Sequence, residues 1–444
     1  MGEHHPCSAA PPAAKSKEPD IVSKLATLVM VLVLGVTAKA AYSEFKFRER
    51  CAALDVDIAT YKRQQWDRPV LRGQAGEGNA ALEALHALQG MSLLDEVERD
   101  RLATQLHHGA PLLPEQLALV AKHAAMIGKL RDATQLSWAM TELSPERGDA
   151  AAAPPYPLLM DAALLMLASA SSASADDCLT ICADVIRLGQ DLVPGAPIEA
   201  ISVAMRLTSV SAPVIARCSE HATIDGLARA ARELGTMAAH PPPIGSGIEF
   251  ADLQTGVRLR KLAELLPNNT DDSPFERLRQ RPVLIEASAF FEKPSRWREL
   301  NATSYPLPLD TWRREQEWRQ SSPLPLVADS AAGVDGWLYD DMRGQALLRA
   351  LTVELGTVAA RLRVKRLPRV PVGLSDPGLR DPFSGQELQW RVPDNGAELA
   401  VWSVGEDRRD DKGMSEWTAM TPIDVVVHFQ LPPLPGAPAA KPQR

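Results

Sequence analysis

The feature that most constrains this chain is an uncharged run near its N-terminus. Residues 25–38 read LATLVMVLVLGVTA, and apolar residues extend the run on both sides, from 21 to 42. A helix over residues 21–42 would be roughly 33 Å long at 1.5 Å per residue, which is enough to cross the hydrocarbon core of a bilayer. Lys24 and Lys39 lie near its ends, where their ammonium groups could reach the headgroups. The run therefore predicts a transmembrane anchor.

A cleaved signal peptide is the competing interpretation of the same residues. An apolar core of about 14 residues also suits the h-region of a signal. Ala38-Lys39-Ala40 has the small-x-small form of a cleavage site, which would release a secreted or periplasmic chain near Ala40. A buried helix of a soluble protein is a third alternative, but such a helix needs apolar neighbours on every side.

Basic residues flank the run on both sides, so the positive-inside rule is nearly balanced. Lys15, Lys17 and Lys24 precede or begin it, and Lys39, Lys46, Arg48 and Arg50 end or follow it. Because the long remainder of the chain follows a signal-like segment, we expect the N-terminus in the cytoplasm. This orientation predicts a single-pass protein of a bacterial inner membrane with the bulk of its chain in the periplasm.

Composition excludes one broad class of function. The chain has 444 residues, 45% of them hydrophobic and 23% charged, which is enough for a sizeable core and two or three domains. Its net charge of −8 argues against a nucleic-acid partner, because phosphate binding requires clustered cations. The one basic run, at residues 361–369, follows a helical stretch. A solvated helix C-terminus stabilised by the helix dipole explains it more simply.

Cysteine usage agrees with export. Four cysteines follow residue 42, an even number that suits an oxidising compartment. Cys178 and Cys182 are four residues apart and share one face of a helix, and Cys218 falls in a later helical stretch that could pack there. We expect one disulfide within this trio. The alternative is that all three are small buried hydrophobic residues.

The fold class expected from the apolar spacing is mainly α. Segments with helical periodicity alternate with Pro- and Gly-containing breaks, which indicates an irregular antiparallel array of helical hairpins followed by a small α+β unit. The expected parts are a disordered tail at 1–20, the anchor or signal at 21–42, a helical domain at 43–266, a Pro- and Trp-rich connector at 267–328 with a short helix over 311–320, the α+β unit at 329–430 and a disordered tail at 431–444.

The α+β unit is expected to contain a long helix and three antiparallel strands. The helix covers about 336–364, and the strands cover 387–392, 398–404 and 423–429. Residues 393–396 read PDNG, a strong hairpin signal because Asn-Gly accepts the positive φ that tight turns need.

Motifs in this unit resemble those of known envelope proteins. The chain reads DPFSG at 381–385, LQWR at 388–391 and VWSVGED at 401–407, with Asp410 and Asp411 just beyond. This string resembles the C-terminal hairpin and loop of the major type II secretion pseudopilins, in which the acidic loop binds calcium. It is also similar to the corresponding string of large uncharacterised membrane-anchored proteins of planctomycetes and myxobacteria, whose helical middle resembles residues 177–218. The resemblance covers most of the chain and implies no activity.

The resemblance implies a calcium site, and the residues themselves allow one. Carboxylate oxygens in a flexible loop are the ligands that Ca²⁺ prefers. The candidate ligands are Asp407, Asp410, Asp411 and Asp424. Arg408 and Arg409 stand where the pseudopilin loop carries glycine. Together with Lys412 they could neutralise the carboxylates themselves, which favours an ion-pair loop without metal over a calcium site. No Gly-Phe-Thr-x-x-Glu signal precedes the apolar run, so we do not expect a pilin subunit.

Enzyme motifs are absent from the sequence. It contains no nucleophile elbow, no zinc-protease helix motif, no phosphate-binding loop and no dinucleotide fingerprint. Adjacent acid pairs (Asp176-Asp177, Asp271-Asp272 and Asp340-Asp341) are explained by helix capping, and His107-His108 by a helix C-terminus. We therefore expect no catalytic residue and no cofactor other than calcium. The expected function is a membrane-tethered extracytoplasmic scaffold that binds an envelope protein. The alternative is an extracytoplasmic hydrolase whose site shows no motif.

Overall fold

The computed structural model describes residues 21–73, 76–147, 154–265, 309–322, 334–392, 398–413 and 424–431, together with 305, 307, 327 and 328. The tail expected at 1–20, nearly all of the one expected at 431–444 and most of the connector at 267–328 lie outside the described residues. The described part is mainly helical with two small sheets, and one of these is the C-terminal antiparallel sheet. The expected fold class is therefore confirmed.

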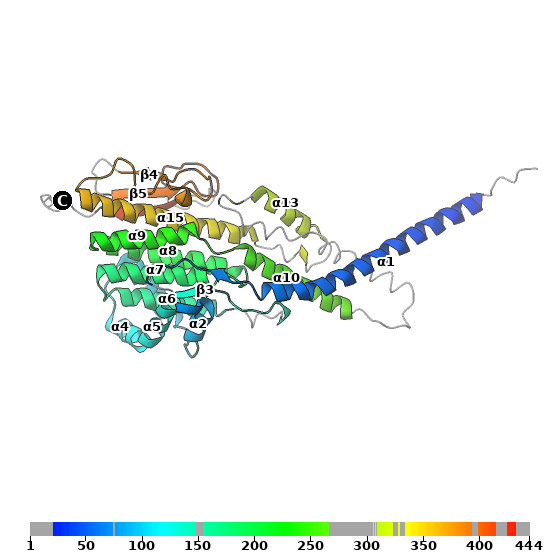
Figure 1. The fold of residues 1–444 in the computed structure, drawn as a ribbon, viewed down its shortest axis with the longest axis horizontal. Helices are drawn as coiled ribbons and strands as arrows, with labels where there is room; N and C mark the ends of the chain where they lie inside the picture. The colour runs from blue at the N-terminus through cyan, green and yellow to red at the C-terminus, as the bar shows by residue number, and fades with distance from the viewer. Residues whose placement is uncertain are drawn as a thin grey trace, which may run out of the picture.

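Helix α1 (Ile21–Tyr61) is a single unbroken helix of 41 residues, about 60 Å long at 1.5 Å per residue. It extends well beyond the predicted anchor at 21–42. Figure 1 shows its N-terminal part projecting away from the rest of the molecule. Near its C-terminal end, Ile58 and Tyr61 are buried in one cluster with apolar residues of α10 (Gly245–Leu265). One end of α1 is thus fixed in the body and the other stands clear of it.

The apolar side chains of the projecting part are uncovered by any described residue. Ile21 is 80% exposed, Leu32 is 64% exposed and Val36 is 49% exposed. By length and mean hydropathy, one helix among the described residues qualifies as a membrane span, and it is α8 (Glu199–Ser219), with 44% of its apolar window buried. Because α8 packs against α7 and α15, packing in the core accounts for its apolar residues. The anchor at 21–42 remains a prediction.

The first part of the body contains a sheet that the sequence analysis did not predict. Strand β3 (Leu136–Ala139) lies between β1 (Trp66–Asp67), which is antiparallel to it, and β2 (Gly76–Asn79), which is parallel. The helices between its strands are α2 (Ala80–Ala87), α3 (Glu96–His108), α4 (Pro114–Lys122) and α5 (Ala124–Ala133), and the 3-10 turn η1 (Pro145–Arg147) follows β3. The region at 43–266, expected as a helical domain, thus also contains this small sheet.

Five helices form the centre of the molecule and lie side by side in Figure 1. They are α6 (Tyr156–Ala170), α7 (Ala175–Asp191), α8, α9 (Ile224–Ala239) and α15 (Val334–Val364). The side chains of Ser174 and Thr223 cap the N-termini of α7 and α9 by accepting hydrogen bonds from backbone N–H groups. One hydrophobic cluster extends from Ala80 to Leu431, so the helical part and the C-terminal part share a core.

The C-terminal sheet has the order β4-β5-β6 and is antiparallel throughout, as predicted. Its strands are β4 (Gln389–Arg391), β5 (Glu398–Ser403) and β6 (Val425–Gln430), and the 3-10 turn η3 (Pro377–Leu379) precedes them. The central strand β5 is buried almost along its whole length and packs on α15. The predicted short helix is also present as α13 (Leu309–Gln320), and an ion pair of 2.6 Å between Arg319 and Asp252 joins it to α10.

One acid pair lies elsewhere than predicted. Asp340 and Asp341 sit inside α15, well past its first residue, so they do not cap it. Asp341 is 7% exposed and accepts a hydrogen bond from the hydroxyl of Tyr305. Burial raises the pKa of Asp341 to about 7, against the opposing effects of that hydrogen bond and of the Arg349 charge. Asp341 therefore helps to hold Tyr305 of the connector on α15.

Candidate functional site

The C-terminal unit contains a hydrogen-bonded centre at Asp381, which is 1% exposed. Within its own turn, Asp381 accepts hydrogen bonds from the Phe383 backbone N–H (2.9 Å) and the Ser384 hydroxyl (3.0 Å). It also accepts hydrogen bonds from the Ser403 hydroxyl (2.7 Å) and the Val404 backbone N–H (3.1 Å), at the end of β5. Each carboxylate oxygen thus has two donors, which offsets the cost of burying a charge.

This centre explains why the two halves of the motif string occur together. The turn at 381–385 closes through a 2.8 Å hydrogen bond from the Gly385 N–H to the Asp381 carbonyl, and Gly385 has φ 73°, which suits glycine. The Asp381 side chain then fixes this turn against residues 403–404. The residues that carry the resemblance at 381–405 therefore hold the sheet together and position the loop that follows it.

The acidic loop begins at Gly405, directly after β5. Its backbone turns through four residues with positive φ, which are Gly405 (65°), Arg408 (58°), Lys412 (61°) and Gly413 (73°). A non-glycine residue adopts such a conformation only when its surroundings impose it. The loop is therefore a specifically shaped turn.

Backbone amides and one indole bind the carboxylates of this loop. Asp407 accepts a hydrogen bond from the Arg409 N–H (3.0 Å). Asp410 accepts from the Lys412 N–H (2.9 Å) and from the Trp402 indole N–H (3.0 Å). These contacts are local turn-forming bonds. An ion-pair loop, the alternative that needs no metal, receives no support, because the three cations bond here through their backbones or not at all among the described residues.

Asp424 is a buried carboxylate that the loop satisfies only in part. It is 5% exposed, and its Oδ2 accepts a 2.9 Å hydrogen bond from the Gly413 N–H. Its Oδ1 is buried without a hydrogen-bond partner among the described residues. Burial raises the pKa of Asp424 to about 6; the N–H groups of Gly413 and Asp411 oppose this rise, and the charges of Asp411 and Asp410 add to it. A cation near this oxygen would offset the cost of ionising Asp424.

The structure thus brings Asp410, Asp411 and Asp424 within electrostatic range of one another and leaves Asp407 in its own turn. Within the described residues, no group of three or more His, Cys, Asp or Glu side chains has the arrangement of a metal site. Residues 414–423, between the loop and Asp424, lie outside the described part. Calcium at Asp407, Asp410, Asp411 and Asp424 therefore stays a prediction.

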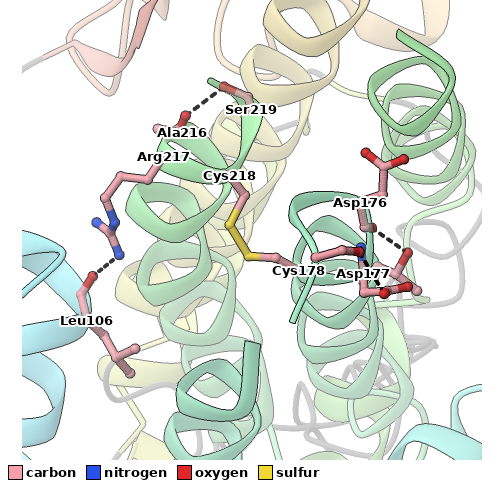
Figure 2. The surroundings of a disulfide bond; sticks show 10 residues. Leu106, Asp176, Asp177, Cys178, Ala216, Arg217, Cys218 and Ser219 are labelled. Atoms are coloured by element: carbon pink, nitrogen blue, oxygen red, sulfur yellow. Dashed lines mark hydrogen bonds between the residues drawn. A yellow bond between two sulfur atoms is a disulfide. The ribbon is translucent and has the colours of Figure 1, made fainter. Parts of the chain in front are cut away.

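A disulfide joins Cys178 of α7 to Cys218 of α8, with 6.4 Å between the Cα atoms (Figure 2). Cys182, one turn further along α7, is a fully buried thiol, and burial raises its pKa well above the ordinary value. This pairing confirms the prediction of one disulfide within the trio. A thiol with a raised pKa is a weak nucleophile, so Cys182 is a packing residue.

Next to the disulfide, a side chain of α8 bonds the end of the helix that carries the two adjacent histidines. Figure 2 shows Arg217, next to Cys218, reaching the C-terminal end of α3, where its guanidinium donates to the carbonyls of Leu106 and His107. Gly109 ends this helix with φ 69°. His107 and His108 are exposed in the last helical turn, as expected for side chains at the negative end of a helix dipole.

A network of buried charges on α7 was missed by the sequence analysis. Asp191 pairs with Arg68 at 2.7 Å and with Arg187 at 3.3 Å, and all three side chains are almost fully buried. Asp184 pairs with Arg72 (2.8 Å) and Arg131 (2.9 Å). The signal that could have revealed them is the spacing of Asp184, Arg187 and Asp191 along one face of an otherwise apolar helix. Through these ion pairs, Arg68 and Arg72 fasten the segment after β1 to the core.

A single acid lies in the core beneath the C-terminal sheet. Glu354 of α15 is 0% exposed, and its Oε1 accepts a 3.1 Å hydrogen bond from the Val401 N–H of β5. Burial raises the pKa of Glu354 well above its ordinary 4.5. Burial thus favours the neutral form of Glu354, and its hydrogen bond joins α15 to β5.

No protein-family model, no curated protein and no solved structure matches this chain. The resemblance to pseudopilins and to membrane-anchored proteins of planctomycetes and myxobacteria therefore remains an expectation drawn from the motifs. The site's geometry has to carry the functional argument.

Proposed function

We propose that the chain is a membrane-tethered interaction protein of the bacterial envelope. Residues 21–42 hold it in the inner membrane with a single span, and its body lies in the periplasm, where it binds another envelope protein. The observation that carries this proposal is the continuity of α1. A helix whose apolar first half is exposed and whose last turns are buried in the body is suited to joining a folded unit to a bilayer.

The disulfide supports the periplasmic side of the proposal. Disulfides persist in oxidising compartments and are rare in the bacterial cytoplasm. Cys178 and Cys218 close their bond between two helices that contribute to the main hydrophobic core. A body that folds around this bond is suited to the far side of the inner membrane.

The helical hairpins support an interaction role. Packed hairpins offer extended surfaces to partners, as helical repeat proteins do. The buried charges that resemble catalytic groups are already paired: Asp191 with Arg68 and Arg187, and Asp184 with Arg72 and Arg131. These pairings favour an interaction protein over the hydrolase alternative.

Membrane extraction tests the proposal. The full-length chain is expected to stay in the membrane pellet after a carbonate wash and to be released by detergent. Protease added to spheroplasts should digest the body. Leu32→Arg should weaken retention, because an Arg at the centre of a span costs about 3 kcal/mol. The matched control is Leu93→Arg, at a body residue of similar exposure (55%), which should leave retention unchanged.

Two outcomes would contradict the membrane tether. Full-length chain in the soluble fraction without detergent would refute it outright. A mature chain beginning near Ala40 would replace it with the cleaved-signal alternative, in which the protein is periplasmic or secreted.

A further inference from the structure

The basic run at 361–369 is the feature that the proposed function does not yet use. It contains Arg361, Arg363, Lys365, Arg366 and Arg369, five cations in a chain of net charge −8. The sequence analysis explained it as a helix C-terminus. The structure ends α15 at Val364, so Lys365, Arg366 and Arg369 lie beyond the helix. The helix dipole acts over the last turn and does not account for them.

The segment after α15 has a fixed backbone. The Val372 N–H donates a 2.9 Å hydrogen bond to the hydroxyl of Thr357, two turns back in the helix. Pro371 and Leu374 are buried, and Leu367 packs against the main core. The cations are thus presented from an ordered surface, so a partner that binds them has little chain entropy to overcome.

Three exposed valines are interspersed with these cations. Val364 is 55% exposed, Val370 is 54% exposed and Val372 is 44% exposed. Exposed aliphatic side chains beside arginines are typical of protein interfaces, where an apolar centre is surrounded by charged groups. We call residues 361–372 the basic surface.

Two acids at the N-terminus of α7 are engaged within the fold. At the N-terminus of α7, Asp176 accepts hydrogen bonds from the Thr223 N–H (2.8 Å) and hydroxyl (2.6 Å), while Asp177 accepts from the Ser174 hydroxyl (2.7 Å). The side chains of Arg363, Lys365, Arg366 and Arg369 are exposed and form no ion pair with the described residues. Their charge is therefore available to a partner.

The position of the basic surface favours a protein partner. In Figure 1 the C-terminal end of α15 lies at the opposite end of the body from the projecting part of α1. A bilayer crossed by α1 would therefore lie far from the basic surface. Four of the five cations are arginines, whose planar guanidinium groups can each bind a carboxylate through two hydrogen bonds.

We infer that the basic surface is the docking site for an acidic protein partner, whose Asp and Glu side chains pair with Arg363, Arg366 and Arg369 around the exposed valines. This inference rests on the proposed function, since it names the class of partner that the interaction protein binds. It places the partner at the end of the body remote from the tether.

Site-specific cross-linking in native membranes tests the inference with the full-length chain. A photo-cross-linking amino acid is placed at the position of Val370, and the cross-linked residues are mapped by mass spectrometry. The expected adduct is with a protein segment rich in Asp and Glu. The yield of this adduct should fall about tenfold or more when Arg363, Lys365, Arg366 and Arg369 are all changed to Gln. Each lost ion pair lowers the affinity for the partner, and a tenfold loss of affinity corresponds to only about 1.4 kcal/mol.

A matched control separates this surface from net charge. Changing four exposed cations elsewhere, Lys122, Lys129, Arg206 and Arg229, to Gln removes the same charge and should leave the yield unchanged. An adduct with phospholipid, an adduct with a segment that is not acidic, no adduct at all, or equal yields in the two variants would overturn the inference. Membrane retention is scored in the same cells, so failure of the tether and failure of the docking site are distinguished.

Discussion

The hydroxyl of Ser403 donates a 2.7 Å hydrogen bond to the carboxylate of Asp381, 22 residues earlier in the chain. This contact joins the turn before β4 to the end of β5, so two motifs that are separate in the sequence form one unit. Since the Val404 N–H also bonds to Asp381, at 3.1 Å, the entry to the acidic loop depends on this side chain.

Asp381→Ala should destabilise the protein by about 3 kcal/mol, because it leaves buried donors without an acceptor. Chemical denaturation in detergent followed by circular dichroism measures the change. Asp376→Ala is the control. Asp376 is exposed and caps only the short turn η3 through Gly378, so its loss should cost about 1 kcal/mol. Equal costs for the two substitutions would contradict the central role of Asp381.

Glu354→Gln should stabilise the protein more as the pH rises from 5 to 8. The folded state raises the pKa of Glu354 above its ordinary 4.5, so folding takes up a proton over this range. The contribution of Glu354 to stability is full below pH 4.5 and declines as the pH rises towards the folded pKa. Glutamine keeps the acceptor for the Val401 N–H and does not titrate. The measurement is the free energy of unfolding of both proteins at several pH values, and a difference that does not change with pH would refute the raised pKa of Glu354.

Cys178→Ser should lower the free energy of unfolding by about 4 kcal/mol, the value expected from the chain entropy of a closed loop of this length. The bond closes a loop with a sequence separation of 40. Cys182→Ala is the control, because it removes a buried thiol without opening the loop. Peptide mapping without reduction should find Cys178 linked to Cys218. A bond to Cys182 would contradict the structure.

Calcium titration calorimetry of the full-length chain tests the acidic loop. We expect heat of binding at pH 7.5 and less at pH 5.5, because Asp424, with its pKa raised to about 6, is protonated in the more acidic buffer. Asp424→Asn should abolish the heat, since it removes the charge beside the unpartnered Oδ1. Asp376→Asn, outside the loop, should bind as the wild type does. A wild-type chain that gives no heat at pH 7.5 has no calcium site here.

The sequence predicted the elements whose signals are local. The PDNG turn between two β-rich runs predicted that β4 and β5 pair, and the apolar spacing predicted the helices that became α8 and α9. Strands β1 and β2 were missed because they are short, and β2 reads GEGN, which lacks the β-branched and aromatic residues typical of strands. Their pairing with β3 depends on tertiary contacts that no local pattern encodes.

For the candidate sites, too, the sequence predicted what depends on local signals and missed what depends on tertiary contacts. The spacing of Cys178 and Cys182 placed both thiols on one face of a helix. It left open which of them bonds to Cys218, because that depends on how the two helices pack. The acidic loop was located from its carboxylates. Its contacts were not foreseen, since they are made to backbone N–H groups and to the Trp402 indole, whose positions follow from the turn geometry. The valines of the basic surface gave no signal, because isolated exposed valines are common.

The unbroken course of α1 has a mechanical consequence for a tethered protein. With no proline or loop between its projecting part and Tyr61, the helix behaves as a lever arm, so its tilt in the bilayer sets the direction in which the body points. Spanning helices tilt by about 20° on average, and over roughly 60 Å this moves the far end sideways by about 20 Å. The remote end of the body could then reach partners within a circle of about that radius. Because membrane thickness changes the tilt of a spanning helix, it would also change the size of this circle.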